Sequence, residues 1–107
     1  MPKTKKIERL VRRNGKARVV MTWAIRTQIE NDKAFSLHVY RSIMRFIRND
    51  WGDTSKHDWK LNDQDYVALR KGEYGRILAV YENTWPPNKI WIIEDSEAIT
   101  ILFPSDY

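Results

Sequence analysis

Helix-type and strand-type patterns occupy separate parts of this chain, and this grouping limits the possible folds more than any other feature. Three short runs rich in β-branched and aromatic residues follow one another at 76–81, 89–93 and 98–103, separated by turn-forming residues, and they predict an antiparallel meander. A similar run at 18–22 precedes a helical region at 23–71. The grouping predicts an α+β fold, with helices on one face of a small antiparallel sheet in the order β-α-α-α-β-β-β.

The segment 33–48 carries the clearest helical pattern. Four apolar residues recur in it at intervals of four, four and three, as one face of a helix requires. They are Phe35, Val39, Ile43 and Phe46. A weaker apolar arc lies beside them, formed by Leu37, Tyr40 and Met44. The first stripe is expected to face the core, and the second arc is available for another contact.

Two further helices are expected on either side of this one. Thr22 has the side chain of an N-cap, so a short helix should follow it. A third helix is predicted from a cap at Asn62 and Asp63 to Lys71, with Gly72 as its stop signal.

Length and composition indicate one self-folding domain. The 107 residues are 42% apolar and include five Trp, more than a disordered chain carries. The absence of Cys excludes disulfides, thiolate metal sites and thiol nucleophiles. No long apolar stretch or hydrophobic signal segment is visible, so we expect a cytoplasmic protein that does not engage a membrane.

Positive charge is concentrated at the N-terminus. Residues 1–20 hold eight basic residues against Glu8 alone, a net charge of +7, whereas the whole chain is +5 and the remaining 87 residues are therefore −2. This asymmetry predicts a basic arm, 1–17, ahead of a single α+β domain, 18–107. Such an arm favours nucleic acid or an acidic protein surface as partner.

Two structures are open to the arm. Ile7, Leu10 and Val11 have the spacing of a short amphipathic helix. Alternatively, Asn14-Gly15 is a preferred pair for a two-residue hairpin turn, which would make the arm the first strand of a hairpin with 18–22. The pattern slightly favours the hairpin.

Several short motifs resemble a known family. They are the Asp50-Trp51-Gly52-Asp53 turn, the Lys89-Ile90-Trp91-Ile92-Ile93 run and the C-terminal Leu102-Phe103-Pro104 with Asp106-Tyr107, supported by Met21-Thr22 and by Leu78 to Tyr81. This set resembles a family of small uncharacterised plasmid- and phage-associated bacterial proteins. The resemblance covers about 18–107, and the loop 94–97 is shorter here than in the family. It implies a mobile-element setting and carries no activity with it.

An acidic region offers candidate metal ligands. It contains Asp50, Asp53, Asp58, Asp63 and Asp65, with His57 nearby. These residues could hold a divalent metal, but the spacing matches no ligand motif, and Asp at helix ends is expected for capping. Neither His57 nor His38 has the neighbours of a catalytic base. We therefore expect no enzyme, no metal, no cofactor and no catalytic residue.

Basic residues are the better candidates for function. In the arm they are Lys5, Lys6, Arg9, Arg12, Arg13, Lys16 and Arg18, and on the helix at 33–48 they are Arg41, Arg45 and Arg48. The arm could neutralise several phosphates, but it lacks aromatic residues, so only non-specific contact is supported. Of the aromatic residues in the strand region, Tyr81, Trp85 and Trp91 form either a stacking platform or part of the core, and the core is favoured.

Three functions follow from these observations. The first is a non-catalytic mobile-element protein that binds nucleic acid or a nucleic-acid-handling complex through the basic residues. The second is a protein-directed inhibitor of a host defence complex such as CRISPR or restriction. The third, which the acidic region supports weakly, is a metal-dependent nuclease. A homodimer through an open sheet edge is compatible with all three.

Overall fold

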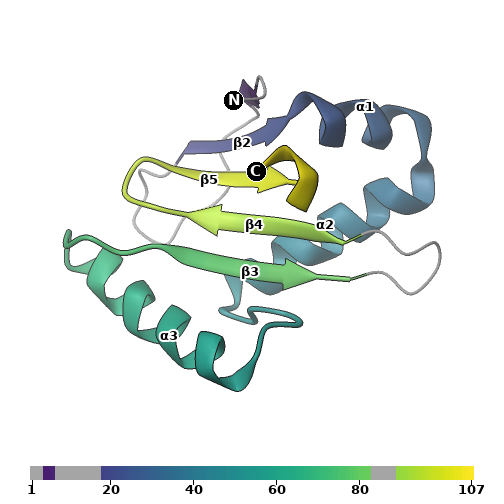
Figure 1. Ribbon diagram of the computed structural model, residues 1–107. Coiled ribbons are helices and arrows are strands. Elements are labelled where there is room, and N and C mark those ends of the chain that lie inside the picture. The colour runs from purple at the N-terminus through teal and green to yellow at the C-terminus, as the bar shows by residue number, and fades with distance from the viewer. Residues whose placement is uncertain (1–3, 7–17, 83–88) are drawn as a thin grey trace.

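The computed structural model describes residues 4–6, 18–82 and 89–107. Its elements are, in chain order, β1 (Thr4–Lys6), β2 (Arg18–Thr22), α1 (Trp23–Asn31), α2 (Lys33–Ile47), α3 (Lys56–Arg70), β3 (Ile77–Tyr81), β4 (Ile90–Glu94), β5 (Ala98–Leu102) and the 3-10 helix η1 (Pro104–Asp106). From β2 to β5 these elements confirm the α+β class and the predicted order β-α-α-α-β-β-β (Figure 1).

The strands form one sheet in the order β1-β2-β5-β4-β3. β3, β4 and β5 are the antiparallel meander that their spacing predicts. The expectation of an antiparallel sheet needs one correction, because β2 pairs parallel with β5 and the sheet is therefore mixed. Three helices separate β2 from β3, and a crossover of this length can bring the chain back to the end of the sheet at which β2 began, as parallel strands require.

The N-terminal arm contributes β1 to this sheet. β1 pairs antiparallel with β2, with Thr4 opposite Thr22 and Lys6 opposite Val20. Residues 4–6 therefore form a strand beside β2, but the pairing of Lys6 with Val20 differs by three residues from the register that a two-residue turn at Asn14-Gly15 would impose. The residues on which the helix alternative and the Asn14-Gly15 turn depend lie outside the described residues.

One face of the sheet and the inner face of α2 build the core. In β3, Ile77, Ala79 and Tyr81 are fully buried and alternate with half-buried residues, the period of two of a strand. α2 crosses behind β4 in Figure 1 and buries Phe35, Val39 and Phe46, with Ile43 packed at their margin. The apolar stripe predicted at 33–48 is therefore confirmed as the core-facing side of α2.

α3 has a different position from α1 and α2. It runs along the outer edge of β3 and places Leu69 in the core (Figure 1). It begins at Lys56, where the Ser55 side chain accepts a hydrogen bond from the N–H of Asp58, so the predicted start at Asn62 and Asp63 is wrong. Its expected end is confirmed, since Gly72 follows the helix with a φ of +77°.

Candidate functional site

The Asp50 to Asp53 turn is attached to the outer edge of β3. The Trp51 side chain is fully buried, its ring packs edge-on against Phe46 at 5.3 Å, and its indole N–H donates to Asp63 Oδ1 at 2.9 Å. The Val80 N–H donates to the Trp51 carbonyl at 3.2 Å, and the Asp53 N–H donates to the Val80 carbonyl at 2.6 Å. Trp51 thus fixes the turn in the core while its backbone extends the sheet.

Polar side chains complete the same edge of β3. The Asn62 side-chain amide donates to the Leu78 carbonyl at 2.9 Å and accepts from the Leu78 N–H at 3.2 Å. Asp65 accepts from the Arg76 N–H, and Asp53 accepts from the Glu82 N–H, both at 3.0 Å. An exposed edge strand can pair with another chain, and these contacts occupy the groups that would do so. A homodimer built through β3 is therefore disfavoured.

The candidate acidic ligands are largely used in these contacts. Asp53 and Asp65 hold the β3 edge, Asp63 accepts from Trp51, and Asp50 binds Arg45. They act mainly on the edge strand and the turn, not on the helix ends where capping was expected. Within the ranges that the structure describes, no group of three or more His, Cys, Asp or Glu side chains is placed to hold a metal ion.

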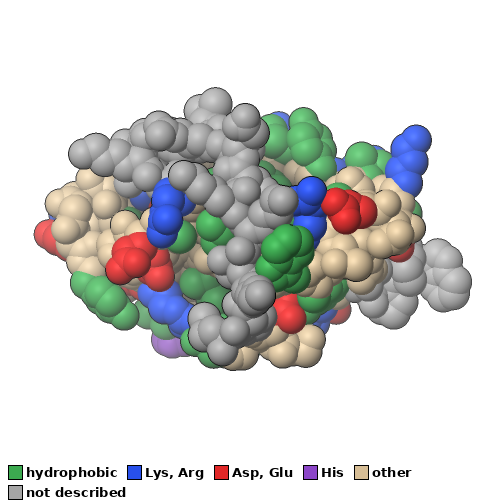
Figure 2. Space-filling model, turned by 90° about the horizontal axis from the view of Figure 1, so that it is seen from above, with side chains coloured by type: hydrophobic (Ala, Val, Ile, Leu, Met, Phe, Trp, Pro, Cys, Tyr) green, Lys and Arg blue, Asp and Glu red, His purple; other side chains and the backbone are tan. Residues whose placement is uncertain are grey.

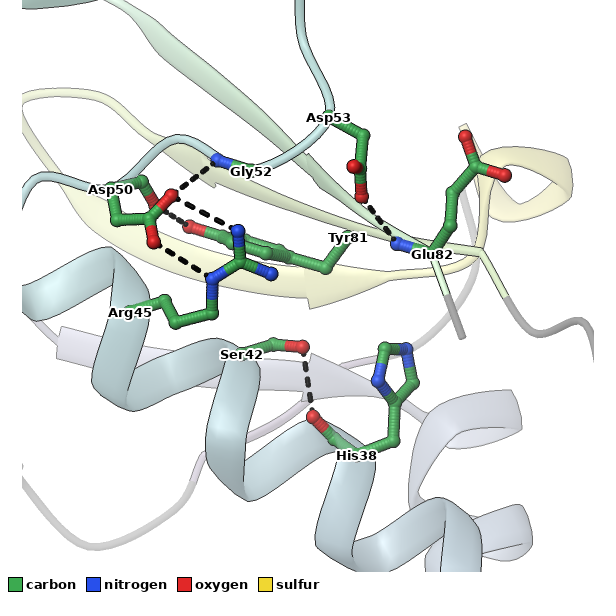
Figure 3. A network of polar contacts seen from close by, with 8 residues as sticks. All are labelled: His38, Ser42, Arg45, Asp50, Gly52, Asp53, Tyr81 and Glu82. Carbon is green, nitrogen blue, oxygen red and sulfur yellow. Dashed lines mark hydrogen bonds and ion pairs between the residues drawn. The ribbon is translucent and has the colours of Figure 1, made fainter. Parts of the chain in front are cut away.

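Arg45 and Asp50 form a two-point ion pair. Arg45 Nε donates to Asp50 Oδ2 at 2.8 Å and Nη2 donates to Oδ1 at 3.1 Å (Figure 3). The hydrogen bond from Arg45 lowers the pKa of Asp50, and the Gly52 N–H adds to this effect while desolvation opposes it. Tyr81 donates its hydroxyl to the Asp50 carbonyl at 2.7 Å, and the Arg45 guanidinium lies 5.2 Å from the Tyr81 ring centroid. Arg45 is thus held in a structural network.

The outer face of α2 carries cations and exposed apolar side chains. Lys33–Ile47 contains no Asp or Glu. Arg41 and Arg48 are exposed and make no ion pair within the described residues. Leu37 is 47% exposed and Tyr40 is 61% exposed on the same face. The predicted apolar arc is therefore at the surface, beside Arg41 and Arg48, which take no part in the Arg45–Asp50 ion pair.

A groove runs along one side of this face. It has a volume of about 360 Å³. Its lining residues are Ala34, Leu37, His38, Arg41, Ser42, Arg45 and Glu82. Figure 3 shows His38 rising from α2 toward the end of β3, where Glu82 lies. Glu82 was not among the sequence candidates, because its approach to α2 depends on how β3 packs and no local pattern signals it.

A second groove lies on the sheet face that points away from α2. It has a volume of about 420 Å³. Leu78, Val80 and Trp91 contribute apolar surface, and Asp53, Asp58, Glu82 and Lys89 contribute charge. The sequence leaves open whether the aromatic residues of the sheet form a stacking platform or part of the core. Tyr81 is fully buried in the core, whereas Trp91 is half-buried on the opposite face of the sheet. Trp85 lies outside the described residues.

Three of the other predicted binding residues lie on β1 and β2. Arg18 is exposed at the start of β2, and Lys5 and Lys6 belong to β1. Arg9, Arg12, Arg13 and Lys16 lie outside the described residues. Seen from above, basic and acidic side chains are interspersed over the described surface of this view, and neither kind forms a large patch (Figure 2).

Comparisons of the chain with protein-family models, with curated proteins and with solved structures found no match. Among the described residues, no helix is both long and apolar enough to cross a bilayer.

Proposed function

We propose that this protein binds nucleic acid, or a complex that handles nucleic acid, through its basic arm and the outer face of α2, and that it does so without catalysing a reaction. The observation that carries the proposal is the charge distribution: +7 in residues 1–20 against −2 in the rest. The resemblance to plasmid- and phage-associated proteins supports a cytoplasmic, mobile-element setting for this activity.

The physical basis is neutralisation of phosphate charge. Each Lys or Arg that approaches a phosphate releases condensed counterions, so binding is favourable at low salt and weakens steeply as salt rises. Lys33 and Arg41 on α2 and Arg48 at its C-cap are exposed, and the helix itself contains no acidic residue, although Asp32 caps its N-terminus. Arg45 is held by Asp50, so it adds to the positive electrostatic potential near α2 more than it contacts phosphates directly.

A salt titration tests the proposal. Binding of labelled DNA and RNA, measured by fluorescence anisotropy, should weaken at least tenfold between 50 mM and 200 mM salt, because several phosphates are contacted. Replacing Arg9, Arg12 and Arg13 by Gln should reduce the slope of log K against log salt by about 2 to 3. The matched control replaces Lys56, Lys60 and Lys71, which are exposed on and after α3, and should leave the slope nearly unchanged. No binding at 50 mM salt would refute the proposal.

A second candidate function is inhibition of a host defence enzyme such as a restriction or CRISPR complex. The observation that favours it is the groove at Asp53, Asp58 and Glu82, whose carboxylates complement the basic channel of a nucleic-acid enzyme. A pull-down from a host that carries such a system should then recover a stoichiometric protein. Asp58→Lys should abolish the capture, while Glu73→Lys, at an exposed position outside the groove, should not. Recovery of nucleic acid alone would count against this candidate.

A further inference from the structure

The outer face of α2 combines features that phosphate binding alone does not require. We infer that the nucleic acid bound at α2 is single-stranded, with one base in the groove beside His38 and Arg41 and a neighbouring base on Tyr40. This inference rests on the proposed function and specifies its ligand.

The groove has the side chains that hold an unstacked base. Unpaired bases are bound by stacking on aromatic rings or on guanidinium planes and by hydrogen bonds to their edges. His38 and Arg41 supply such planar groups, Leu37 supplies an apolar wall, and Glu82 supplies a carboxylate acceptor for a base amino group. The groove volume of about 360 Å³ is in the range of small-ligand sites.

Tyr40 supplies a second stacking surface on the same helix. It is 61% exposed, so much of its ring is accessible to a base. Leu37 precedes it by three residues and Met44 follows by four, so the three share a helix face. Leu37 also lines the groove, so a strand that crosses α2 there can place consecutive bases on both sides of it.

The charges around this face also favour a flexible single strand over a duplex. Lys33, Arg41 and Arg48 can contact phosphates along the outer side of α2. Glu82 is exposed just after β3, on the far side of the groove. A rigid duplex has a second backbone that this carboxylate would repel, and its bases are stacked inside where neither Tyr40 nor the groove can reach them. A single strand can turn away from the carboxylate and present its base faces.

Two pairs of variants test the inference in the full chain. Binding of a 20-mer of deoxycytidine, whose bases carry an amino group that Glu82 could accept from, and of a duplex of the same length would be measured by anisotropy at 50 mM salt. Tyr40→Ala should weaken single-strand binding about tenfold, the loss expected for one stacked base, and duplex binding less than twofold. Tyr40→Phe keeps the ring and should bind normally. Tyr74→Ala, at a tyrosine that is 86% exposed outside α2, is the matched control.

The groove is tested by filling it. Ala34 is exposed and lines the groove, so Ala34→Phe should leave the fold intact, weaken single-strand binding several-fold and spare duplex binding. Ala24→Phe, at an exposed position on α1, is its control. Equal binding of single strand and duplex, unaffected by Tyr40→Ala and Ala34→Phe, would overturn this inference and leave the proposed function intact. Binding of neither form would instead overturn the proposed function itself.

Discussion

At the scale of single residues, the turn from Asp50 to Asp53 shows why each position requires its residue type. Trp51 fills the core, and Asp50 and Asp53 accept backbone hydrogen bonds that hold the turn and the end of β3. Gly52 has a φ of +77° and touches β3, where a Cβ atom would lie 2.0 Å from the Val80 carbonyl oxygen. The motif that carries the family resemblance therefore has a structural role in this chain.

Gly52→Ala should be strongly destabilising, by about 2 to 4 kcal/mol, because it adds a steric clash to the cost of a left-handed backbone. Gly72→Ala is the matched control, since Gly72 has the same φ but nothing within 4 Å of its Cβ position. It should cost about 1 kcal/mol. Urea unfolding of the two variants separates the cost of the steric clash from the cost of the left-handed backbone. Equal losses of unfolding free energy in the two variants would contradict the close approach at Gly52.

The Arg45–Asp50 pair predicts a pH dependence of stability. The pKa of Asp50 is lowered in the folded protein, so the stability it contributes is present above the ordinary carboxyl pKa and is lost as the pH falls through the folded value. Asp50→Asn should therefore cost about 1 kcal/mol at pH 7, a modest value because the pair is partly exposed.

The comparison is made by urea unfolding of wild type and variant at several pH values. The difference between them should shrink as the pH is lowered below about 4, where aspartate begins to protonate in the unfolded chain. Glu73→Gln, at an exposed position outside the ion pair and outside the helices, is the control. If the difference in unfolding free energy stayed constant down to the lowest pH at which the protein is folded, the ion pair would be excluded as its source.

At the scale of elements, α3 protects an edge strand and α2 presents two different faces. Asn62 is buried on α3 and satisfies both outward backbone groups of Leu78, so the edge of β3 is closed by a side chain rather than by another strand. α2 buries one apolar stripe and exposes another at Leu37 and Tyr40. One amphipathic pattern therefore builds the core, and the other is available for binding.

Asn62→Ala should destabilise the protein by about 2 to 3 kcal/mol, because it leaves the N–H and carbonyl of Leu78 without their partner in a partly buried setting. It should also promote association through the opened edge of β3. Urea unfolding and light scattering measure the two effects. Gln64→Ala, at an exposed position on the same helix, should change neither.

At the scale of the whole molecule, one core joins the helices to the sheet. Buried residues from β2, α1, α2, α3 and all three strands of the meander belong to a single cluster. The Arg70–Glu94 ion pair, at 3.0 Å with Glu94 only 2% exposed, adds a further link between α3 and β4. No described helix or strand of this set has a core of its own, so none is expected to unfold separately.

Unfolding of the full chain should therefore be a single cooperative transition. Tryptophan fluorescence, to which the buried Trp51 contributes, and far-UV circular dichroism should give the same midpoint in urea. Midpoints that differ beyond experimental error would indicate independent units and contradict the single-domain prediction for 18–107.

The sequence by itself determined what depends on neighbours along the chain. The core stripe of α2 follows from a helical period, the meander from three β-branched runs, and the charge of the arm from composition. Thr22 also caps α1 as its residue type predicts. Each of these features depends on residues a few positions apart, whose contacts are nearly independent of the rest of the fold.

The tertiary structure alone decided which elements meet. The parallel pairing of β2 with β5, the closure of β3 by Asn62 and Asp65, and the approach of Glu82 to α2 all join segments that are distant in sequence. The local pattern also fails to predict the start of α3, because Asn62 and Asp63 resemble a helix cap but form hydrogen bonds with β3 and Trp51 instead. Asparagine and aspartate bind backbone groups in either setting, and packing selects between the two.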